Sequence, residues 1–442
     1  MATSGKIASR GADERIGAAP LPAAASIICR YYSVWAIYAF GGGFLYGVYP
    51  LFLRSRGLSQ FEMNSVLATY FAVTFMTDVP TGAFADAFGR RRAFVLGCVL
   101  RASAFLLYFF AHRYAVFLVA EAIDGVGTTF CNGAIDAWGV DALDDAGFTG
   151  LKDRLFSRIS QFTNLGFMLS AIVGAWVGSY NLAWPWLLGA AGYLLSAMAG
   201  RLMMDEPRRS RTLSRPHEAV VTTVARRIGR GFRIGFANRA IFILSLANGA
   251  FFAAWAPSWL EWPQFFADAY RRGPWIVGWI YALFTIARMA GAEAVVRSGF
   301  GPEARARILT ATALTVAIAF VAAWLASGRT NAALGCFVAM NLGIGALLPM
   351  AQSWFNAEIG AADRATLLSF NSTFATMGAA TGLLTTGAFA DVHGIPAVWA
   401  VSGVIMLFTA PLFLLLSRFA SRSRGRAGAF SVSSDGGPNL EA

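Results

Sequence analysis

The sequence predicts an all-α polytopic membrane protein in which twelve transmembrane helices form two pseudo-symmetric six-helix bundles. Of its 442 residues, 57% are hydrophobic and only 14% are charged, and apolar runs of about twenty residues recur along the chain. Basic residues gather in alternate connecting segments. The two halves of the chain also share a weak repeat. Because lipid offers no hydrogen bonds to the backbone, each span is expected to be helical.

Apolar periodicity and loop charges place the twelve spans. They are expected at residues 27–53, 61–85, 93–111, 114–140, 156–179, 183–204, 239–262, 274–297, 307–327, 331–356, 365–388 and 396–418. Residues 27–204 would form an N-terminal six-helix bundle and residues 239–418 a C-terminal one. A basic cytoplasmic linker would join them at residues 205–238. Residues 1–26 are expected to be a cytoplasmic tail, and residues 419–442 a disordered cytoplasmic tail.

The net charge of +12 does not indicate a nucleic-acid partner, because of where the charge lies. Most Lys and Arg residues fall in the tails, the linker and the loops of one side, which predicts that both termini are cytoplasmic in a multi-pass cell membrane protein. The linker segment 220–236 could form an amphipathic helix on anionic lipid or stay solvated. The four cysteines are scattered, so neither a metal site nor a disulfide is expected.

A repeat relates the two halves. Trp138, followed by Asp153-Arg154, precedes the fifth span, and Trp354, followed by Asp363-Arg364, precedes the eleventh. This echo, offset by about half of the chain, indicates that the two halves are related.

The segment between the second and third spans carries the most specific motif, Gly-x-x-x-Asp-x-x-Gly-Arg-Arg, from Gly82 to Arg91. Gly89 tolerates the positive φ that a tight turn between two helices needs. Asp86 can accept charge-assisted hydrogen bonds from neighbouring guanidinium groups. A short basic loop of any polytopic protein is the alternative interpretation.

This motif and its position resemble the loop between helices two and three of the major facilitator superfamily, although Ala87 departs from the basic residue often found there. The resemblance implies a secondary transporter with two rocking halves. We expect a cytoplasmic gate that closes when the cavity faces outward. Its residues would be Gly82, Asp86, Gly89, Arg90, Arg91, Asp141 and Arg154.

Ionisable residues inside the predicted spans indicate function, because a charge at a helix centre costs about 2.5–3.5 kcal/mol. The acids outnumber the three arginines Arg30, Arg101 and Arg288. Some acids must therefore face water or hold a proton, as proton coupling requires. The proton-coupling candidates are Asp78, Glu121, Asp124 and Asp136, and bracing of neighbouring helices is the alternative role.

The fourth span carries a polar stripe. Seven small or polar residues fall within about 120° of a helical wheel. They are Glu121, Asp124, Gly125, Thr128, Asn132, Asp136 and Gly139. Such a stripe is expected to face a water-filled cavity along its whole depth.

Three stretches resemble the drug:proton antiporter branch that includes tetracycline-resistance-type exporters: residues 78–82, 121–141 and 364–369. In the fourth span, Glu121 to Gly125 replace the Arg-x-x-Gln-Gly that the superfamily often carries, which moves the expected proton relay to Glu121 and Asp124. The Gly-Pro motif associated with antiporters is missing from the fifth span, since no proline follows Ser157 before Asn181.

Polar and aromatic side chains on several spans suggest a substrate cavity. Close packing or interhelical hydrogen bonding is the alternative for each of them. The cavity candidates are Tyr38, Asn132, Gln161, Asn164, Asn248, Phe252, Trp255, Arg288, Asn341, Gln352 and Asn371.

The predicted function is proton-coupled efflux of small amphiphilic compounds by alternating access. Transport of a specific metabolite, siderophore or organic anion is the alternative, since the three arginines could hold an acidic ligand. A transport-inactive receptor or a membrane enzyme is a third class, but no catalytic triad, metal-ligand set or phosphate-binding loop supports an enzyme. No cofactor is expected. The expected partners are a small-molecule substrate, protons and membrane lipid, with the protein acting as a monomer.

Overall fold

The computed structural model describes residues 22–148, 152–206, 232–298, 304–359 and 364–416, and these are helical without any strand. The helices before the linker are α1 (Pro22–Gly43), α2 (Tyr49–Ser55), α3 (Gln60–Phe88), α4 (Arg90–Phe110), α5 (Tyr114–Asp145), α6 (Lys152–Gly178) and α7 (Trp184–Met203). Those after it are α9 (Arg239–Trp255), α10 (Ser258–Tyr270), α11 (Trp275–Ser298), α12 (Arg305–Leu325), α13 (Thr330–Glu358), α14 (Arg364–His393) and α15 (Ile395–Leu407).

The helices confirm the predicted fold class. Seven helical segments in the described part of the chain are long and apolar enough to cross a membrane. Others, such as α3 and α14, carry more polar residues along their length. If α1 with α2 and α9 with α10 each count as one span, the helix order is consistent with twelve spans.

Two predicted spans are broken. The span expected at 27–53 divides into α1 and α2, and Gly47 adopts a φ of +91° in the turn between them. The span expected at 239–262 divides into α9 and α10 at Ala256-Pro257 and extends to Tyr270. In each case a glycine- or proline-containing break interrupts an otherwise continuous apolar run, so hydropathy alone did not reveal it.

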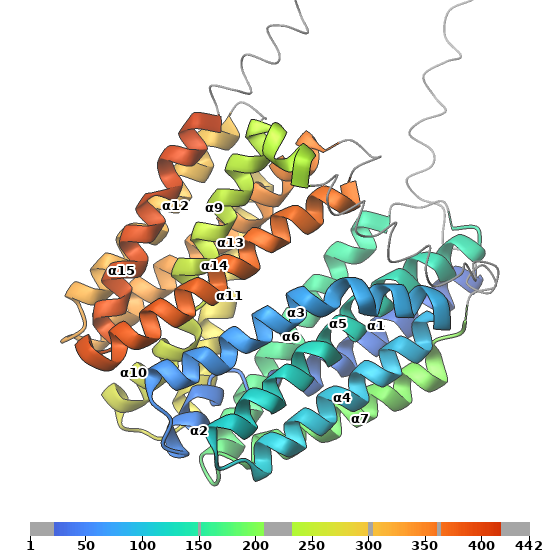
Figure 1. Ribbon diagram of the computed structural model, residues 1–442, viewed down its shortest axis with the longest axis horizontal. Helices are drawn as coiled ribbons and strands as arrows, with labels where there is room; N and C mark the ends of the chain where they lie inside the picture. The colour runs from blue at the N-terminus through green and yellow to red at the C-terminus, as the bar shows by residue number, and fades with distance from the viewer. Residues whose placement is uncertain (1–21, 149–151, 207–231, 299–303, 360–363, 417–442) are drawn as a thin grey trace, which may run out of the picture.

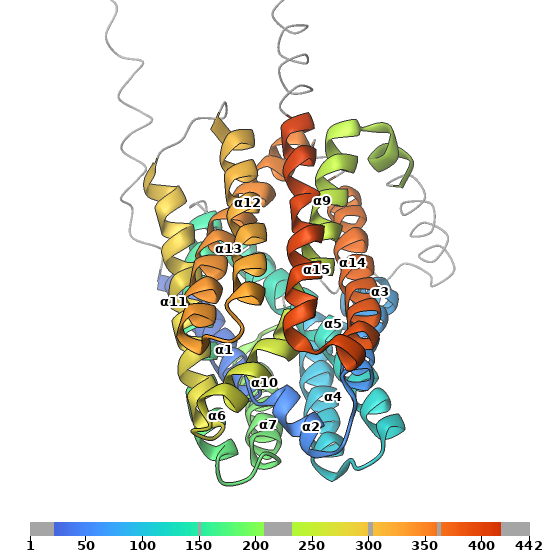
Figure 2. The same cartoon turned by 90° about the vertical axis from the view of Figure 1, so that its left-hand side faces the viewer.

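The helices pack as two groups, α1–α7 and α9–α15, as Figures 1 and 2 show. The first group surrounds a core that includes Tyr108, Trp138 and Trp186. The core of the second includes Phe266, Phe337 and Trp399. Each group buries large aromatic side chains of its own, so each half is a packed unit.

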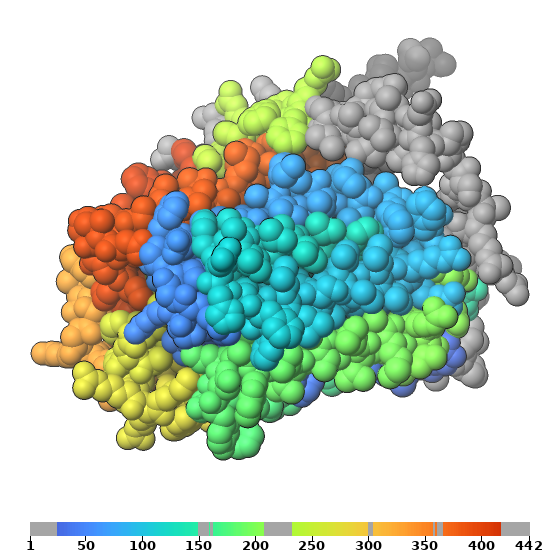
Figure 3. Space-filling model, turned by 60° about the horizontal axis from the view of Figure 1, so that its bottom comes forward, coloured from blue at the N-terminus to red at the C-terminus, as the bar shows by residue number. Residues whose placement is uncertain are grey.

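The two groups meet through α2 and α10, at what the sequence predicts to be the outer end. Arg54 on α2 pairs with both carboxylate oxygens of Asp268 on α10, at 2.7 and 3.1 Å. Gln264 on α10 donates from Nε2 to Oε1 of Gln60, at 2.9 Å. In Figure 3 the blue segment around α2 lies against the yellow and orange-red surface of the second half.

The start of α3 meets the end of α14 at the same place. Asp391 accepts hydrogen bonds from the backbone N–H groups of Gln60 and Phe61, at 2.8 and 3.0 Å. Asn64 donates to the carbonyl of Leu383 at 2.9 Å. Every hydrogen bond that the structure gives between described residues of the two halves lies at this end, and the two groups of helices diverge toward the other (Figure 1). The described part of the molecule is therefore shut at its predicted outer end.

Candidate functional site

The turn between α3 and α4 has the predicted backbone geometry. Gly89 ends α3 and precedes α4 with a φ of +102°. A Cβ on this residue would also lie 2.5 Å from both carboxylate oxygens of Glu206. The backbone conformation therefore favours glycine here, and a larger residue would also displace the carboxylate of Glu206.

The gate motif ties together the ends of four helices within the first half, at what the sequence predicts to be the cytoplasmic side. Arg90 pairs with Asp86 at 2.6 Å and lies 3.8 Å from Asp141 on α5. Arg91 lies 4.0 Å from Glu206, just beyond α7. At Gly82 an added Cβ would meet no atom within 4 Å. The side chain of Arg154, the last predicted member, is outside the described residues.

Sequence reasoning missed the acidic pair that follows α7. Asp205 pairs with Arg30 on α1 at 2.6 Å, and its backbone carbonyl accepts a hydrogen bond from Trp138 Nε1 at 2.7 Å. Two adjacent acids directly after a span, before a strongly basic linker, are a signal that could have identified this contact. Arg30 is consequently paired and not free to hold an acidic ligand.

The outer half of the polar stripe on α5 is buried, which corrects the expectation that the whole stripe faces a cavity. Asp124 accepts two hydrogen bonds from Arg101 on α4, from Nε at 2.8 Å and from Nη2 at 3.1 Å. The two side chains are only 13% and 9% exposed. Arg101 also donates to the hydroxyl of Tyr38 at 2.6 Å and lies 4.3 Å from the ring centroid of Tyr193. Its charge is therefore neutralised inside the bundle.

Glu121 occupies a second buried site one turn away. Its Oε2 accepts hydrogen bonds from the hydroxyls of Tyr108 and Tyr49. The ring of Tyr108 stacks on Trp186 at 3.9 Å. The carboxyl group thus lies among α2, α4 and α7. Facing helices supply partners for both acids, which the wheel of a single helix could not reveal.

Beyond Thr128 the same stripe is partly exposed, although Gly139 is buried. The carboxylate of Asp136 accepts hydrogen bonds from Tyr31 at 2.7 Å and from Trp35 Nε1 at 3.1 Å, both on α1. Tyr38 donates to Asn132 at 3.4 Å. Asn132 and Asp136 both keep solvent access. The structure thus brings together three of the predicted residues, Tyr38, Asn132 and Asp136, along α1 and α5.

Asp78 on α3 is exposed, and its carboxylate forms no hydrogen bond or ion pair with a described residue. It is therefore available to water, to a proton or to a ligand.

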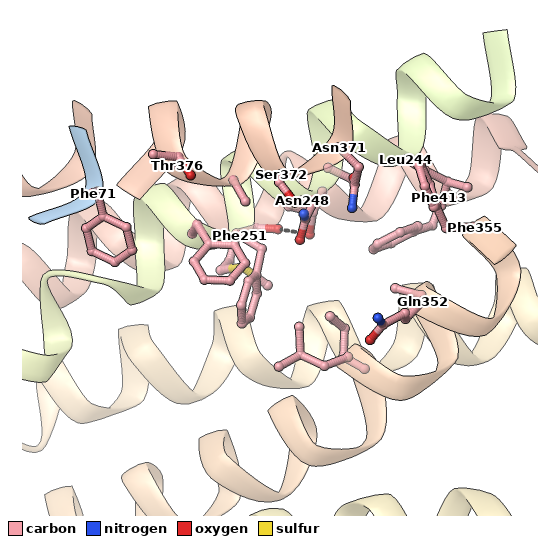
Figure 4. Close-up of a pocket in the computed structure, with 18 residues that line it drawn as sticks. Phe71, Leu244, Asn248, Phe251, Gln352, Phe355, Asn371, Ser372, Thr376 and Phe413 are labelled. Atoms are coloured by element: carbon pink, nitrogen blue, oxygen red, sulfur yellow. Dashed lines mark hydrogen bonds between the residues drawn. The ribbon is translucent and has the colours of Figure 1, made fainter. Parts of the chain in front are cut away.

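A cavity of about 430 Å³ lies in the second half, among α9, α13, α14 and the segment 406–413. Three predicted amides line it: Asn248, Gln352 and Asn371 (Figure 4). Its other walls are apolar and aromatic and include Phe251, Phe252, Phe355 and Phe413, with Phe71 of α3 at one end. No charged side chain of the described residues lines this cavity.

Several predicted cavity residues lie elsewhere. Asn341 is buried and donates to the carbonyl of Phe337 on its own helix, at 2.8 Å. Trp255 packs on Trp259, with ring centroids 5.0 Å apart. Arg288 donates to Thr285 at 3.2 Å, and Asn164 is exposed on α6. The side chain of Gln161 is outside the described residues.

Comparison with known proteins settles the family. The model of the Major Facilitator Superfamily matches residues 32–334. The chain belongs to this superfamily. Its members are carriers and not enzymes, so the chain is a membrane transporter.

Curated relatives are distant. "Multidrug resistance protein 2" of Bacillus subtilis (strain 168) is 23% identical over 168 residues, which are 38% of this chain and 40% of the relative. "Quinolone resistance protein NorA" of Staphylococcus aureus (strain MRSA252) is 22% identical over 187 residues, 42% of this chain and 47% of the relative. The chain thus spans less than half the length of these relatives.

Solved structures support the fold. A mutant of the nucleoside transporter NupG matches with a TM-score of 0.72 and 11% identity, covering 88% of this chain and 99% of that one. A D-xylose-proton symporter matches with a TM-score of 0.68 and 15% identity, covering 88% and 97%. At such identities the likeness establishes the shared fold and carries no information on substrate.

Proposed function

We propose that this transporter exports small amphiphilic compounds in exchange for protons, by alternating access in the cell membrane. Both termini would lie in the cytoplasm, and the protein would act as a monomer without a cofactor. The observation that carries the proposal is the cavity in the second half. It combines an aromatic and apolar wall with three amides and lacks a charged side chain among the described residues.

Such a wall suits an amphiphilic ligand better than an acidic one. Phe251, Phe252 and Phe355 offer ring faces, while Asn248 and Gln352 can donate or accept hydrogen bonds without fixing a single ligand. The names of the two curated relatives point the same way, since both concern resistance to drugs.

The exposed acids are the best candidates for coupling. Asp136 accepts hydrogen bonds from Tyr31 and Trp35, yet its side chain is exposed. Asp78 is exposed without a partner among the described residues. A carboxylate that water reaches can exchange a proton as the conformation changes, whereas Asp124 and Glu121 are enclosed by α4. We therefore assign coupling to Asp78 and Asp136, and bracing to Asp124 and Glu121.

Efflux from proteoliposomes tests this proposal. A fluorescent amphiphilic cation is loaded, and its release is followed with and without an imposed pH gradient. Acceleration by the gradient is expected for the unmodified protein and is lost in Asp136→Asn and Asp78→Asn, while downhill release persists. Glu293→Gln is the matched control, because Glu293 pairs with Arg297 at the exposed end of α11. Gradient-driven release that survives in both Asp variants would exclude them as coupling residues.

Arg288 favours a second candidate, transport of an organic anion or other specific metabolite. It lies beneath the Tyr281 ring, 5.7 Å from the centroid, and has no acidic partner among the described residues. Arg30 and Arg101 are both paired with acids. In the same vesicles, uptake of a simple organic acid that Arg288→Gln abolishes would favour this candidate. Binding without any flux would instead indicate a transport-inactive receptor.

A further inference from the structure

Glu261 is an acid for which the proposed mechanism has no role. It lies on α10, and its side chain is 0% exposed. Neither Oε1 nor Oε2 has a hydrogen-bond partner. The indole of Trp399 on α15 faces this carboxyl group, and its Nε1 donor is also buried without an acceptor. An acid enclosed in this way cannot be explained by packing alone.

The charged form of Glu261 would be strongly disfavoured in this conformation. A buried carboxylate needs a cation or several hydrogen-bond donors to offset the loss of its hydration. Here neither oxygen accepts a hydrogen bond of ordinary geometry, although the indole of Trp399 lies within reach. The neutral acid needs far less compensation than the carboxylate does in the conformation that is shut at the α2 and α10 end.

No charged group on the helices around α10 compensates Glu261. On α2, Arg54 is engaged by Asp268, and Arg56 just beyond this helix contacts His112. On α11, Arg288 is held near Thr285 and Tyr281. The remaining titratable groups on the neighbouring helices, among side chains that the structure describes, are Tyr49 on α2, Glu293 and Arg297 at the far end of α11, Arg239 at the far end of α9, and Cys336 on α13, while α15 has none. None of them pairs with Glu261.

Glu261 lies on the helix that holds the two halves together. Gln264, three residues further on, contacts Gln60, and Asp268, seven residues further on, pairs with Arg54. An opening at this end must pull α10 away from α2 and α3. That movement would admit water beside the buried face of α10, and a hydrated carboxyl group can ionise.

We propose that Glu261 is a proton-binding site that controls opening of the α2 and α10 end. The proton is bound while this end is shut and leaves to water when it opens. Acid on the predicted outer side therefore favours the shut state, and alkali favours the open one. This site builds on alternating access but is independent of the substrate and of Asp78 and Asp136.

The test measures opening directly, so it does not depend on transport. A cysteine reporter replaces Thr386, which is 2% exposed and packs near Asn64 at the junction of α3 and α14. The four native cysteines are changed to alanine. Intact cells expressing the protein are treated with a membrane-impermeant maleimide. Because thiol reactivity itself rises with pH, each rate is divided by that of a cysteine at Gly328, where an added Cβ meets nothing within 4 Å.

The normalised labelling rate is expected to rise about threefold or more between about pH 5.5 and about pH 8. In Glu261→Gln, which mimics the protonated acid, it stays low at both pH values. Glu261→Met provides a neutral side chain of similar length without an amide group, and it is used if the glutamine variant fails to fold. Glu293→Gln is the control and should keep the pH dependence.

Two outcomes would overturn the proposal. One is an unchanged pH dependence in both Glu261 variants. The other is a labelling rate that responds to replacing sodium by choline at constant pH, because this would assign the site to a metal cation. The labelling rate does not depend on transport. The proposal for Asp136 and Asp78 can therefore fail, through efflux that survives in both variants, while the proposal for Glu261 holds, and the reverse is also possible.

Discussion

The two acids Asp124 and Asp136 lie on one face of α5 but in different surroundings. Asp124 is enclosed with Arg101, whereas Asp136 is exposed beside Tyr31 and Trp35. The two side chains have the same chemistry but different roles, because a buried acid needs a permanent partner and an exposed acid does not. A wheel of a single helix places them on the same stripe and cannot separate them.

We expect Asp124→Asn to destabilise the protein and not merely to uncouple it. The substitution leaves the Arg101 guanidinium buried without a counter-charge, and breaking a buried pair in this way costs about 3–5 kcal/mol. The midpoint of thermal unfolding in detergent should fall by several degrees. Asp78→Asn, which removes an unpaired exposed acid, should leave that midpoint unchanged.

Replacing both partners separates the two roles of this pair. The double variant Arg101→Leu with Asp124→Leu should recover part of the lost stability, since no lone charge is left behind. If Asp124→Asn keeps full stability and loses only gradient-driven efflux, the proton would belong to Asp124 after all.

At the scale of elements, the breaks between α1 and α2 and between α9 and α10 create two short helices that face each other across the halves. At the other end, the turn at Gly89 lets Arg90 on α4 pair with Asp86 on α3 and approach Asp141 on α5, all within the first half. The long helices thus provide the framework, and the short helices and turns provide polar contacts at its ends.

Asp391 illustrates how one element stabilises another. It accepts hydrogen bonds from the first two N–H groups of α3, although Ser59 and Glu62 already cap this helix from within its own half. Removing the cap in Asp391→Ala should therefore leave α3 helical and weaken only the shut conformation. A cap contributes about 1 kcal/mol, which corresponds to a shift of about fivefold in the populations.

Spin labels on the two halves measure this shift. Labels at Arg113 and Gly328, both in loops at the predicted outer end, should show a longer distance in a larger fraction of Asp391→Ala molecules. Asp391→Asn retains one acceptor oxygen and should show a smaller change. Identical distance distributions in the three proteins would mean that this cap does not control the conformation.

At the scale of the whole molecule, the two packed halves meet through few polar contacts, all at one end of the described structure. The strong core of each half, with few polar contacts between the halves, permits the halves to rock as units. The ion pair between Arg54 and Asp268 is exposed, so it contributes about 1 kcal/mol or less to stability. It can break in each cycle without unfolding either half.

A covalent link at this position should stop the cycle. In the double variant Arg54→Cys with Asp268→Cys, a bifunctional thiol reagent should abolish transport while equilibrium binding of substrate persists. A reducible reagent followed by a reductant should restore transport. The unlinked double variant is the control and should transport at nearly the rate of the unmodified protein. Transport that continues after complete cross-linking would exclude separation of α2 from α10 as part of the cycle.

The sequence by itself was enough to show that this is a membrane protein, that it is helical and which superfamily it resembles. Apolar runs long enough to cross a membrane must be helical, because lipid offers the backbone no hydrogen bonds. The motif from Gly82 to Arg91 is a glycine turn followed by basic residues, and both features can be read from neighbouring residues in the sequence. The predicted spans did not show the breaks near Gly47 and Pro257, which hydropathy averages away. They also missed the end of α15 at Leu407, and several other predicted ends differ by a few residues.

The tertiary structure decided which polar residues have partners. Arg101 on α4 pairs with Asp124 on the neighbouring α5, and Asp391 of the second half accepts hydrogen bonds from the start of α3. Glu261 is enclosed at a position where the sequence predicted the end of a span. Such pairings depend on contacts between residues far apart in the chain. Local periodicity shows which face of a helix is polar, but only the packing of the neighbouring helices shows what that face meets.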